Sequence, residues 1–191
     1  MNQWLTYFIC YLIGSVTFGP ILAHLRGVDL KTVGSGNIGA TNVLRALGKK
    51  AATATLIGDT LKGSAAVLLG MYFLEDPVTV GLCGISSIIG HNFPVFLKFR
   101  GGKGVATSLG VLAVYLPLAA AGFVIIWSAV FRIWKISSLS ALFAFSGVFL
   151  IAYFMYQEEF PVITGMFVLA VIMHRGNIVR LIKGAEPRVG G

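Results

Sequence analysis

Long apolar runs alternate with short polar segments along most of this chain. An α-helix rises about 1.5 Å per residue, so about 20 apolar residues are needed to cross the roughly 30 Å hydrocarbon core of a bilayer. The runs that meet or approach this length are residues 3–25, 52–74, 77–97, 138–156 and 161–181. The pattern therefore predicts an all-α integral membrane protein.

A further apolar stretch, residues 104–131, is too long for one straight span and short for two. Pro117 lies near its middle, and a proline there favours a turn because it lacks a backbone donor. We expect a hairpin of two short helices, which gives seven transmembrane helices in all. Five spans with a re-entrant hairpin would describe the same path.

The charged residues between the runs indicate the orientation. In the hairpin arrangement no lysine or arginine falls in a loop on the outer side, whereas four of the seven acidic residues do. Short loops rich in lysine and arginine stay in the cytoplasm, so the N-terminus is predicted outside and the C-terminus inside. Arg26 and Lys31 follow the first apolar run and no positive charge precedes it, which favours a first span over a signal peptide.

Composition agrees with a membrane protein that has no soluble appendage. Of the 191 residues, 57% are hydrophobic and 12% are charged, and the mean hydropathy is +0.86. A soluble domain of this size needs more polar surface. The net charge of +8 does not call for a nucleic-acid partner, because cytoplasmic loops of membrane proteins are basic in any case. We therefore interpret residues 1–191 as one transmembrane domain.

Four polar segments share the predicted cytoplasmic face, and the first covers residues 33–43, with Arg45 close behind. It combines glycines with four polar side chains, Ser35, Asn37, Thr41 and Asn42. Glycine lets successive backbone N–H groups point into one concavity that holds an anion. A helix beginning near Thr41 would add its N-terminal dipole. An ordinary polar loop between helices is the alternative.

The second polar segment, residues 90–107, places Lys98, Arg100 and Lys103 beside several glycines. It departs from a Walker A loop, because Leu97 stands where that motif requires its first glycine. Backbone amides and Lys103 still favour a phosphate-binding loop. Lys98 and Arg100 are better explained as charges that set the membrane orientation.

The remaining two segments are short. Ser137, Ser138 and Ser140 lie at a predicted helix start, where hydroxyls often act as N-caps. His174 and Asn177 flank Arg175 at the last membrane boundary. A lone histidine there is usually structural, but this grouping on the same side as two glycine loops favours ligand binding.

Asp59 and Lys62 lie three residues apart on one face of the second apolar run. A charge near the bilayer centre costs about 2.5–3.5 kcal/mol, so we expect a structural ion pair that faces the bundle interior. The sequence shows no metal-ligand spacing, and neither a metal ion nor a cofactor is expected. Many cations and few free carboxylates on the inner loops suit substrates with two or more phosphate groups.

Three strings, residues 34–42, 90–94 with 101–107, and 174–177, together resemble the signature motifs of the bacterial acyl-phosphate:glycerol-3-phosphate acyltransferases. The resemblance covers essentially the whole chain. It implies transfer of a fatty acyl group from acyl phosphate to the 1-hydroxyl of glycerol 3-phosphate in the inner membrane. The products would be 1-acyl-glycerol 3-phosphate (lysophosphatidic acid) and phosphate, in the first acylation step of bacterial phospholipid synthesis.

The resemblance also implies residue roles. The catalytic residues would be Ser35, Arg45, Lys103, His174 and Asn177. The acyl-phosphate head would be held by Ser35, Gly36, Asn37, Gly39, Ala40, Thr41 and Asn42. Glycerol 3-phosphate would be held by Arg45, Gly101, Gly102, Lys103, Gly104, Ser138, His174 and Asn177. Both substrates and membrane lipid are the expected partners, and the oligomeric state stays open, with a monomer as the simplest case.

The chain departs from the family at Gly176, where a glutamate is common, so another group must support the third motif. The proton acceptor is open between a substrate phosphate oxygen, which the resemblance favours, and the imidazole of His91 or His174. We expect the acyl chain in a groove between helices that opens to the inner leaflet. A transporter or channel for an anionic solute is the main alternative function, and a structural subunit is the other.

Overall fold

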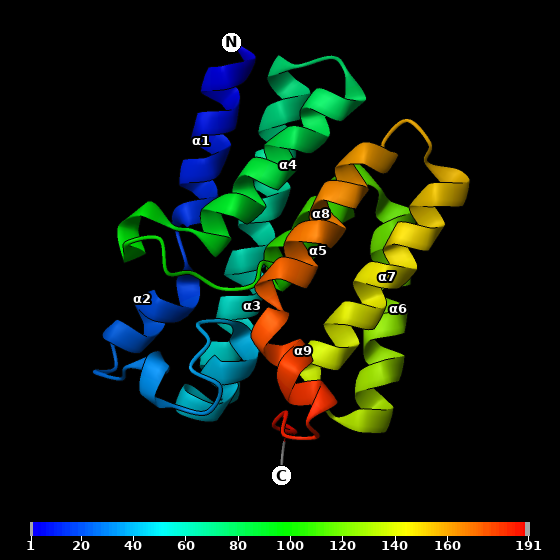
Figure 1. The fold of residues 1–191 in the computed structure, drawn as a ribbon. Helices are drawn as coiled ribbons and strands as arrows, with labels where there is room; N and C mark the ends of the chain where they lie inside the picture. The colour runs from blue at the N-terminus through cyan, green and yellow to red at the C-terminus, as the bar shows by residue number, and fades with distance from the viewer. Residues whose placement is uncertain (1, 190–191) are drawn as a thin grey trace.

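The apolar runs of the sequence form helices in the computed structural model, which describes residues 2–189 (Figure 1). This part of the chain contains nine α-helices, two 3₁₀ turns and no β-strand, so the all-α prediction is confirmed for it. The helices are α1 (Gln3–Ser15), α2 (Phe18–His24), α3 (Ala40–Phe73), α4 (Pro77–Asn92), α5 (Val105–Tyr115), α6 (Pro117–Trp134), α7 (Ser137–Met155), α8 (Phe160–Met173) and α9 (Arg175–Ile182). The 3₁₀ turns are η1 (Leu30–Thr32) and η2 (Val95–Leu97).

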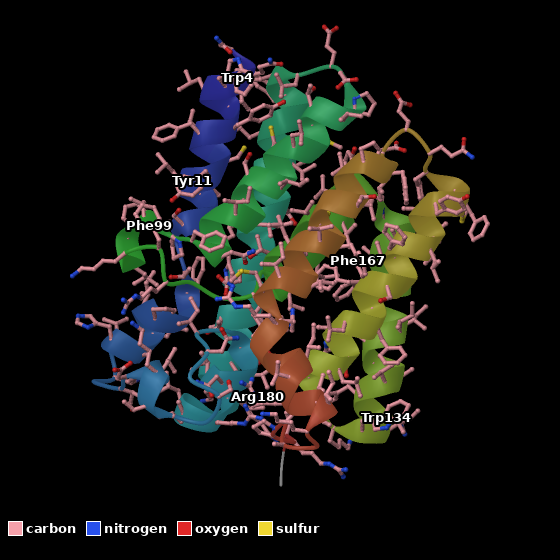
Figure 2. The ribbon with its side chains drawn as sticks, in the orientation of Figure 1. Trp4, Tyr11, Phe99, Trp134, Phe167 and Arg180 are labelled. Carbon is pink, nitrogen blue, oxygen red and sulfur yellow. The ribbon has the colours of Figure 1, made fainter. Side chains whose placement is uncertain are left out.

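Several segments of residues 2–189 are long and apolar enough to cross a membrane. They are Gln3–His24, Pro77–Leu97, Pro117–Trp134 and Ser137–Met155, and the bent pair α8–α9 adds a fifth if it counts as one span. Trp4 lies at the end of the bundle where the chain begins, and Trp134 and Arg180 lie near the other end with the C-terminus (Figures 1 and 2).

The first apolar run is broken between α1 and α2, where a single helix was predicted. Lys62 Nζ donates to the Val16 carbonyl at 2.8 Å, and the Phe18 N–H donates to Asp59 Oδ1 at 3.4 Å. Asp59 and Lys62 are themselves 2.9 Å apart and buried. The cation thus meets the negative end of α1 and the anion meets the positive end of α2, which offsets the helix dipoles at the break.

The stretch 104–131 turns at Leu116–Pro117, as its proline predicts, with Pro117 as the first residue of α6. Of the two helices, α5 is short with 11 residues. The second is longer than predicted, because α6 runs for 18 residues to Trp134 and is long enough to be a span by itself.

Two other helices depart from straight spans. The run 52–74 is only the second part of α3, which begins at Ala40 and kinks at Gly48, where φ is +80° and favours glycine. The run 161–181 bends by 60° at His174, between α8 and α9. Both departures lie toward the end of the bundle that holds the candidate site.

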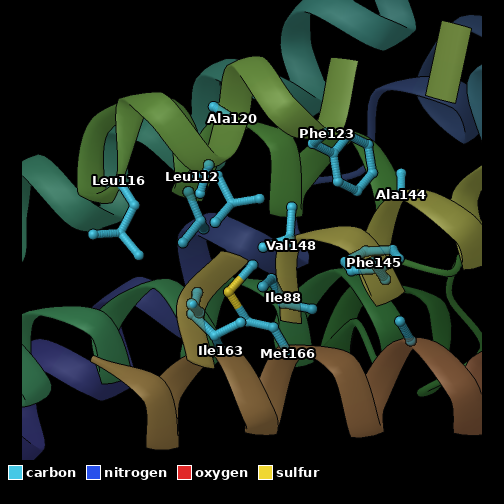
Figure 3. Close-up of a cluster of buried hydrophobic side chains, with 14 of the residues drawn as sticks. Ile88, Leu112, Leu116, Ala120, Phe123, Ala144, Phe145, Val148, Ile163 and Met166 are labelled. Atoms are coloured by element: carbon cyan, nitrogen blue, oxygen red, sulfur yellow. The ribbon is translucent and has the colours of Figure 1, made fainter. Parts of the chain in front are cut away.

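A buried apolar core fixes the helices around that site (Figure 3). Leu112 of α5, Phe123 of α6, Phe145 of α7 and Met166 of α8 all contribute to one cluster. The rings of Phe123 and Phe145 meet edge to face with centroids 5.1 Å apart. Since this core joins α5, α6, α7 and α8, it holds the starts of α5 and α7 in fixed positions relative to the α8–α9 bend.

Candidate active site

A cavity of about 350 Å³ lies where the start of α3, the start of α5, the start of α7 and the α8–α9 bend meet. Its wall includes twelve of the fifteen predicted site residues. They are Ser35, Asn37, Gly39, Ala40, Thr41, Asn42, Arg45, Lys103, Gly104, Ser138, His174 and Asn177. The four polar segments, far apart in the sequence, therefore share one cavity.

The other three predicted residues, Gly36, Gly101 and Gly102, shape the loops and do not line the cavity. The Gly36 N–H closes a turn on the Val33 carbonyl at 3.0 Å, with φ at +68°. The N–H groups of Gly101 and Gly102 donate to α4 carbonyls, each at 3.1 Å. A Cβ added to Gly102 would overlap the His91 ring, so a glycine at this position lets the segment that carries Lys103 pack closely against α4.

The first loop is braced by Asn42, whose side chain is 1% exposed. Its Oδ1 accepts the Ser35 N–H at 3.0 Å, and its Nδ2 donates to the Leu30 carbonyl at 3.0 Å. The next element is α3, whose first residue is Ala40 and whose cap residue, Gly39, makes no side-chain hydrogen bond to the helix end. The first N–H groups of a helix lack intrahelical acceptors, so this end of the cavity attracts an anion.

Cations gather beside that helix start. Arg45 lines the cavity and donates through Nη2 to the Arg188 carbonyl at 3.3 Å. Lys103 lines the same cavity and is half-buried. Burial is the main cause that lowers the pKa of Lys103 to about 8; Glu186 raises this pKa, and the nearby Arg180 and Arg45 lower it further. A phosphate bound here would neutralise this accumulated charge.

The third and fourth segments line the same cavity. The hydroxyls of Thr41 and Ser137 are 3.0 Å apart and link α3 to α7. His174 is 1% exposed, and its Nδ1 lies 2.8 Å from the Ala170 carbonyl. A carbonyl only accepts, so Nδ1 carries the proton and Nε2 is left as the other ring nitrogen of this cavity-lining side chain.

Glu186 is a site residue that the sequence analysis did not assign. It follows α9, lines the cavity, and has a side chain only 7% exposed. Ser138 and Asn177 donate to its Oε1 at 2.7 and 2.5 Å, and Arg180 donates to Oε2 at 2.7 Å. Burial raises the pKa of Glu186, but these hydrogen bonds and the Arg180 charge outweigh it and lower the pKa overall. The sequence contains one feature that could have indicated Glu186, which is that it is one of few carboxylates on the predicted inner loops.

The Arg180–Glu186 contact also bears on the missing glutamate of the third motif. A Cβ added to Gly176 would meet Arg180 Nη1 at 3.6 Å and is otherwise unhindered. A carboxylate at position 176 would therefore stand beside Arg180. In this chain the partner of Arg180, which is labelled in Figure 2, is Glu186 from the segment after α9.

His91 lines the cavity and belongs to the Asp59–Lys62 network. Lys62 Nζ lies 2.9 Å from His91 Nδ1. An ammonium group only donates, so Nδ1 accepts and the ring proton sits on Nε2, beside Gly102. This tautomer presents a donor on the Gly102 side, which argues against His91 as the proton acceptor.

The cavity continues as an apolar arm beyond its polar end. Its walls are Leu56 of α3, Val105 and Leu109 of α5, and Phe123, Val124 and Trp127 of α6. Leu56 is 45% exposed and Val124 is 47% exposed, so the arm reaches the outer surface of the bundle between α3 and α6. A polar, cationic end thus joins a side opening lined by hydrocarbon.

Comparison with known proteins places all of these segments in one family. The sequence model for the family described as glycerol-3-phosphate acyltransferase matches residues 4–184. A glycerol-3-phosphate acyltransferase of Bartonella quintana is 43% identical over 194 residues, covering 98% of this chain and 92% of the relative.

Two solved structures also match, both of PlsY (YgiH), described as an integral membrane glycerol 3-phosphate acyltransferase. The glycerol 3-phosphate form has a TM-score of 0.93 at 39% identity and covers 98% of this chain and 96% of its own. The lysophosphatidic acid form has a TM-score of 0.90 at 38% identity, with coverage of 97% and 94%.

Proposed function

The chain belongs to the glycerol-3-phosphate acyltransferase family, and from that premise we propose that its acyl donor is acyl phosphate. In this proposal the protein transfers the acyl group to the 1-hydroxyl of glycerol 3-phosphate and releases lysophosphatidic acid and inorganic phosphate. The observation that carries the proposal is the single cavity that joins an anion-attracting polar end to an apolar side opening. Such a cavity has room for an amphipathic acyl phosphate beside the small, water-soluble glycerol 3-phosphate.

The proposed membrane arrangement is one domain with seven spans, with the N-terminus outside and the C-terminus in the cytoplasm. The α1–α2 unit, α3, α4, α5, α6, α7 and α8 each contribute one span. The cavity then opens at the cytoplasmic side of the inner membrane, where glycerol 3-phosphate is dissolved. The positive-inside rule supports this orientation, because lysines and arginines cluster at the end of the bundle that holds the cavity.

The donor phosphate is assigned to the loop of residues 35–42 and the start of α3. Backbone N–H groups there and the N-terminal helix dipole stabilise negative charge. Charge on the phosphate grows as the carbonyl–oxygen bond of the mixed anhydride breaks, so donors fixed in place favour the transition state. Asn42 holds the loop in this conformation through Ser35 and Leu30.

The acceptor is assigned to a second set of side chains that line the cavity, with Arg45 and Lys103 on its phosphate and Ser138, His174 and Asn177 near its hydroxyls. Two anions must approach each other, and the cations offset their repulsion and orient the attacking oxygen. The 1-hydroxyl oxygen forms the new ester bond to the acyl carbon as the carbon–oxygen bond to phosphate breaks. The hydroxyl proton passes to an oxygen of the departing phosphate, which keeps the reaction balanced without a protein base.

The acyl chain is assigned to the apolar arm. Of its lining side chains, Leu56 and Val124 are exposed, whereas Val105 and Leu109 are half-buried. The arm is lined by α3, α5 and α6, and its side chains Leu56 and Val124 are exposed on the outer surface of the bundle. A long chain therefore enters from the inner leaflet while its phosphate reaches the polar end.

Phosphate release from the purified protein tests the proposal directly. Palmitoyl phosphate and glycerol 3-phosphate are supplied together and separately, in detergent or lipid. Release that needs both substrates and equals lysophosphatidic acid formation is the expected result. Turnover with another acyl donor but not with acyl phosphate, in protein shown to be folded, would contradict it.

A further inference from the structure

Two carboxylates line the cavity, although its proposed ligands are anions. Asp59 is accounted for by its pairing with Lys62 at the helix break. Glu186 is different, because it contacts two side chains that the proposed function assigns to glycerol 3-phosphate. Its role is therefore a question about the acceptor end of the cavity.

The hydrogen bonds of Glu186 have only one possible direction. An ionised carboxylate accepts and never donates, so Ser138 Oγ and Asn177 Nδ2 must both donate to Oε1, at 2.7 and 2.5 Å. The depressed pKa of Glu186 keeps the group ionised. Glu186 thus fixes the direction of the Ser138 O–H group and the orientation of the Asn177 amide.

These bonds determine what the two side chains can still offer. Ser138 donates its only hydroxyl hydrogen to Glu186, so its oxygen can offer only lone pairs to a substrate. Asn177 has turned its NH₂ toward Glu186, which directs Oδ1 away from the carboxylate. His174 adds to the set, since its Nδ1 proton is directed to the Ala170 carbonyl and its Nε2 keeps a lone pair in the neutral ring. Burial and the nearby Lys103 charge both disfavour a second proton on that ring.

We propose that Glu186 is a positioning residue that makes the wall formed by Ser138, His174 and Asn177 an array of hydrogen-bond acceptors and so selects an acceptor substrate carrying a hydroxyl on carbon 2. Hydroxyl groups donate to such a wall, whereas a ketone oxygen at carbon 2 faces lone pairs and is rejected. The matched competitor is dihydroxyacetone phosphate, which differs from glycerol 3-phosphate only in that ketone. The inference rests on the proposed function, because it assigns the glycerol end to this wall and the phosphate to Arg45 and Lys103.

Glu186→Gln tests the inference, because a glutamine amide can donate. Its NH₂ can satisfy Asn177 Oδ1, which lets the Asn177 amide reverse and turn its own NH₂ to the substrate. The expected result is a fall of about tenfold or more in the kcat/KM ratio of glycerol 3-phosphate over dihydroxyacetone phosphate, with the KM for acyl phosphate unchanged. Glu158→Gln, the same chemical change at an exposed turn between α7 and α8, is the matched control and keeps the wild-type ratio.

A double variant separates selectivity from simple support of Arg180. Gly176→Glu has room for its Cβ beside Arg180 and returns a carboxylate partner to that guanidinium. If Glu186 acts through Ser138 and Asn177, Glu186→Gln with Gly176→Glu regains thermal stability but not substrate selectivity. Recovery of the wild-type ratio in the double variant overturns the inference, as does an unchanged ratio in Glu186→Gln alone.

Binding measurements keep this test independent of turnover. The affinities of the wild type and variants for the two acceptor phosphates are compared without acyl phosphate, and the same shift in ratio is expected. A wild type that binds selectively but does not turn over acyl phosphate refutes the proposed donor and leaves the role of Glu186 intact. If Glu186→Gln does not fold, Ser138→Ala removes one acceptor with Glu186 in place, and an unchanged binding ratio in that variant counts against the inference.

Discussion

Individual side chains at the polar end of the cavity act mainly through charge, and Lys103 is the clearest case. In the proposed function, replacement by alanine removes a half-buried cation from the acceptor phosphate, a contact worth about 1.5–3 kcal/mol. The KM for glycerol 3-phosphate is expected to rise by about 10- to 100-fold, with a smaller effect on kcat. Arg100→Ala, which removes an exposed cation three residues earlier, serves as the control in steady-state assays. Unchanged kinetics in Lys103→Ala would remove Lys103 from the site.

The pH dependence of acceptor binding follows from the same residue. The pKa of Lys103 is lowered to about 8, so its charge is present below that pH and lost as the pH rises through it. The KM for glycerol 3-phosphate should therefore increase from about pH 7 to pH 9. Lys103→Ala should lack this increase, and a wild type with a flat profile over that range would contradict the assignment.

At this scale, the sequence predicted residue types better than their partners. The family resemblance assigned Ser35, Thr41, Arg45 and Lys103, which lie in or close to glycine-rich loops with a recognisable local composition. Glu186 was not assigned, since its contact with Ser138 spans 48 positions in the sequence and depends on how the chain folds back after α9. Nothing in the local sequence around Glu186 indicates that contact.

The helices show how far a buried pair can determine local structure. Lys62→Met leaves Asp59 charged and unpaired at the α1–α2 break, which for a buried pair costs about 3–5 kcal/mol. The double variant Asp59→Asn with Lys62→Met leaves no buried charge. The single variant is expected to have the lower melting temperature in detergent. The opposite order would mean that the helix ends, and not the pairing of the charges, dominate this network.

The apolar arm gives a second prediction for the helices. Leu56→Trp places a larger side chain at the outer edge of the arm between α3 and α6. The KM for a C16 acyl phosphate should rise, while that for a short-chain acyl phosphate should change little. Leu61→Trp, at a more exposed position farther along α3, is the control. An equal effect on both chain lengths would show that the chain does not use this opening.

Apolar length is a reliable guide to the existence of helices but not to their breaks. Pro117 identified the α5–α6 turn because proline acts on its own backbone. The break at Val16–Thr17 is satisfied by Asp59 and Lys62, more than 40 residues away, so local sequence could not predict it. Apolar length did not locate the bend at His174 either. This bend separates the apolar helix α8 from α9, which lies beside the cationic loops.

The molecule as a whole has opposite ends of different charge, which the proposed orientation places on the two sides of the membrane. Cys10 and Cys83 are both buried, so an added cysteine can be labelled against a low background. Gln157→Cys, between α7 and α8, is expected to react with a membrane-impermeant reagent applied outside intact cells. Lys49→Cys, in the cytoplasmic part of α3, is expected to react only after lysis. The reverse pattern would invert the topology.

The side opening between α3 and α6 has a consequence for how the two substrates are counted. In the proposed function, glycerol 3-phosphate reaches the cavity from water, so its availability depends on its molar concentration. A lipid-embedded donor that enters between Leu56 and Val124 is instead limited by its mole fraction in the leaflet. When inert lipid is added at a fixed total amount of donor, the mole fraction of the donor in the leaflet falls. The reaction is then expected to slow, although the bulk concentrations of donor and glycerol 3-phosphate have not changed. If the donor is an acyl phosphate in the leaflet, as we propose, membrane growth itself dilutes the donor and leaves the concentration of glycerol 3-phosphate unchanged.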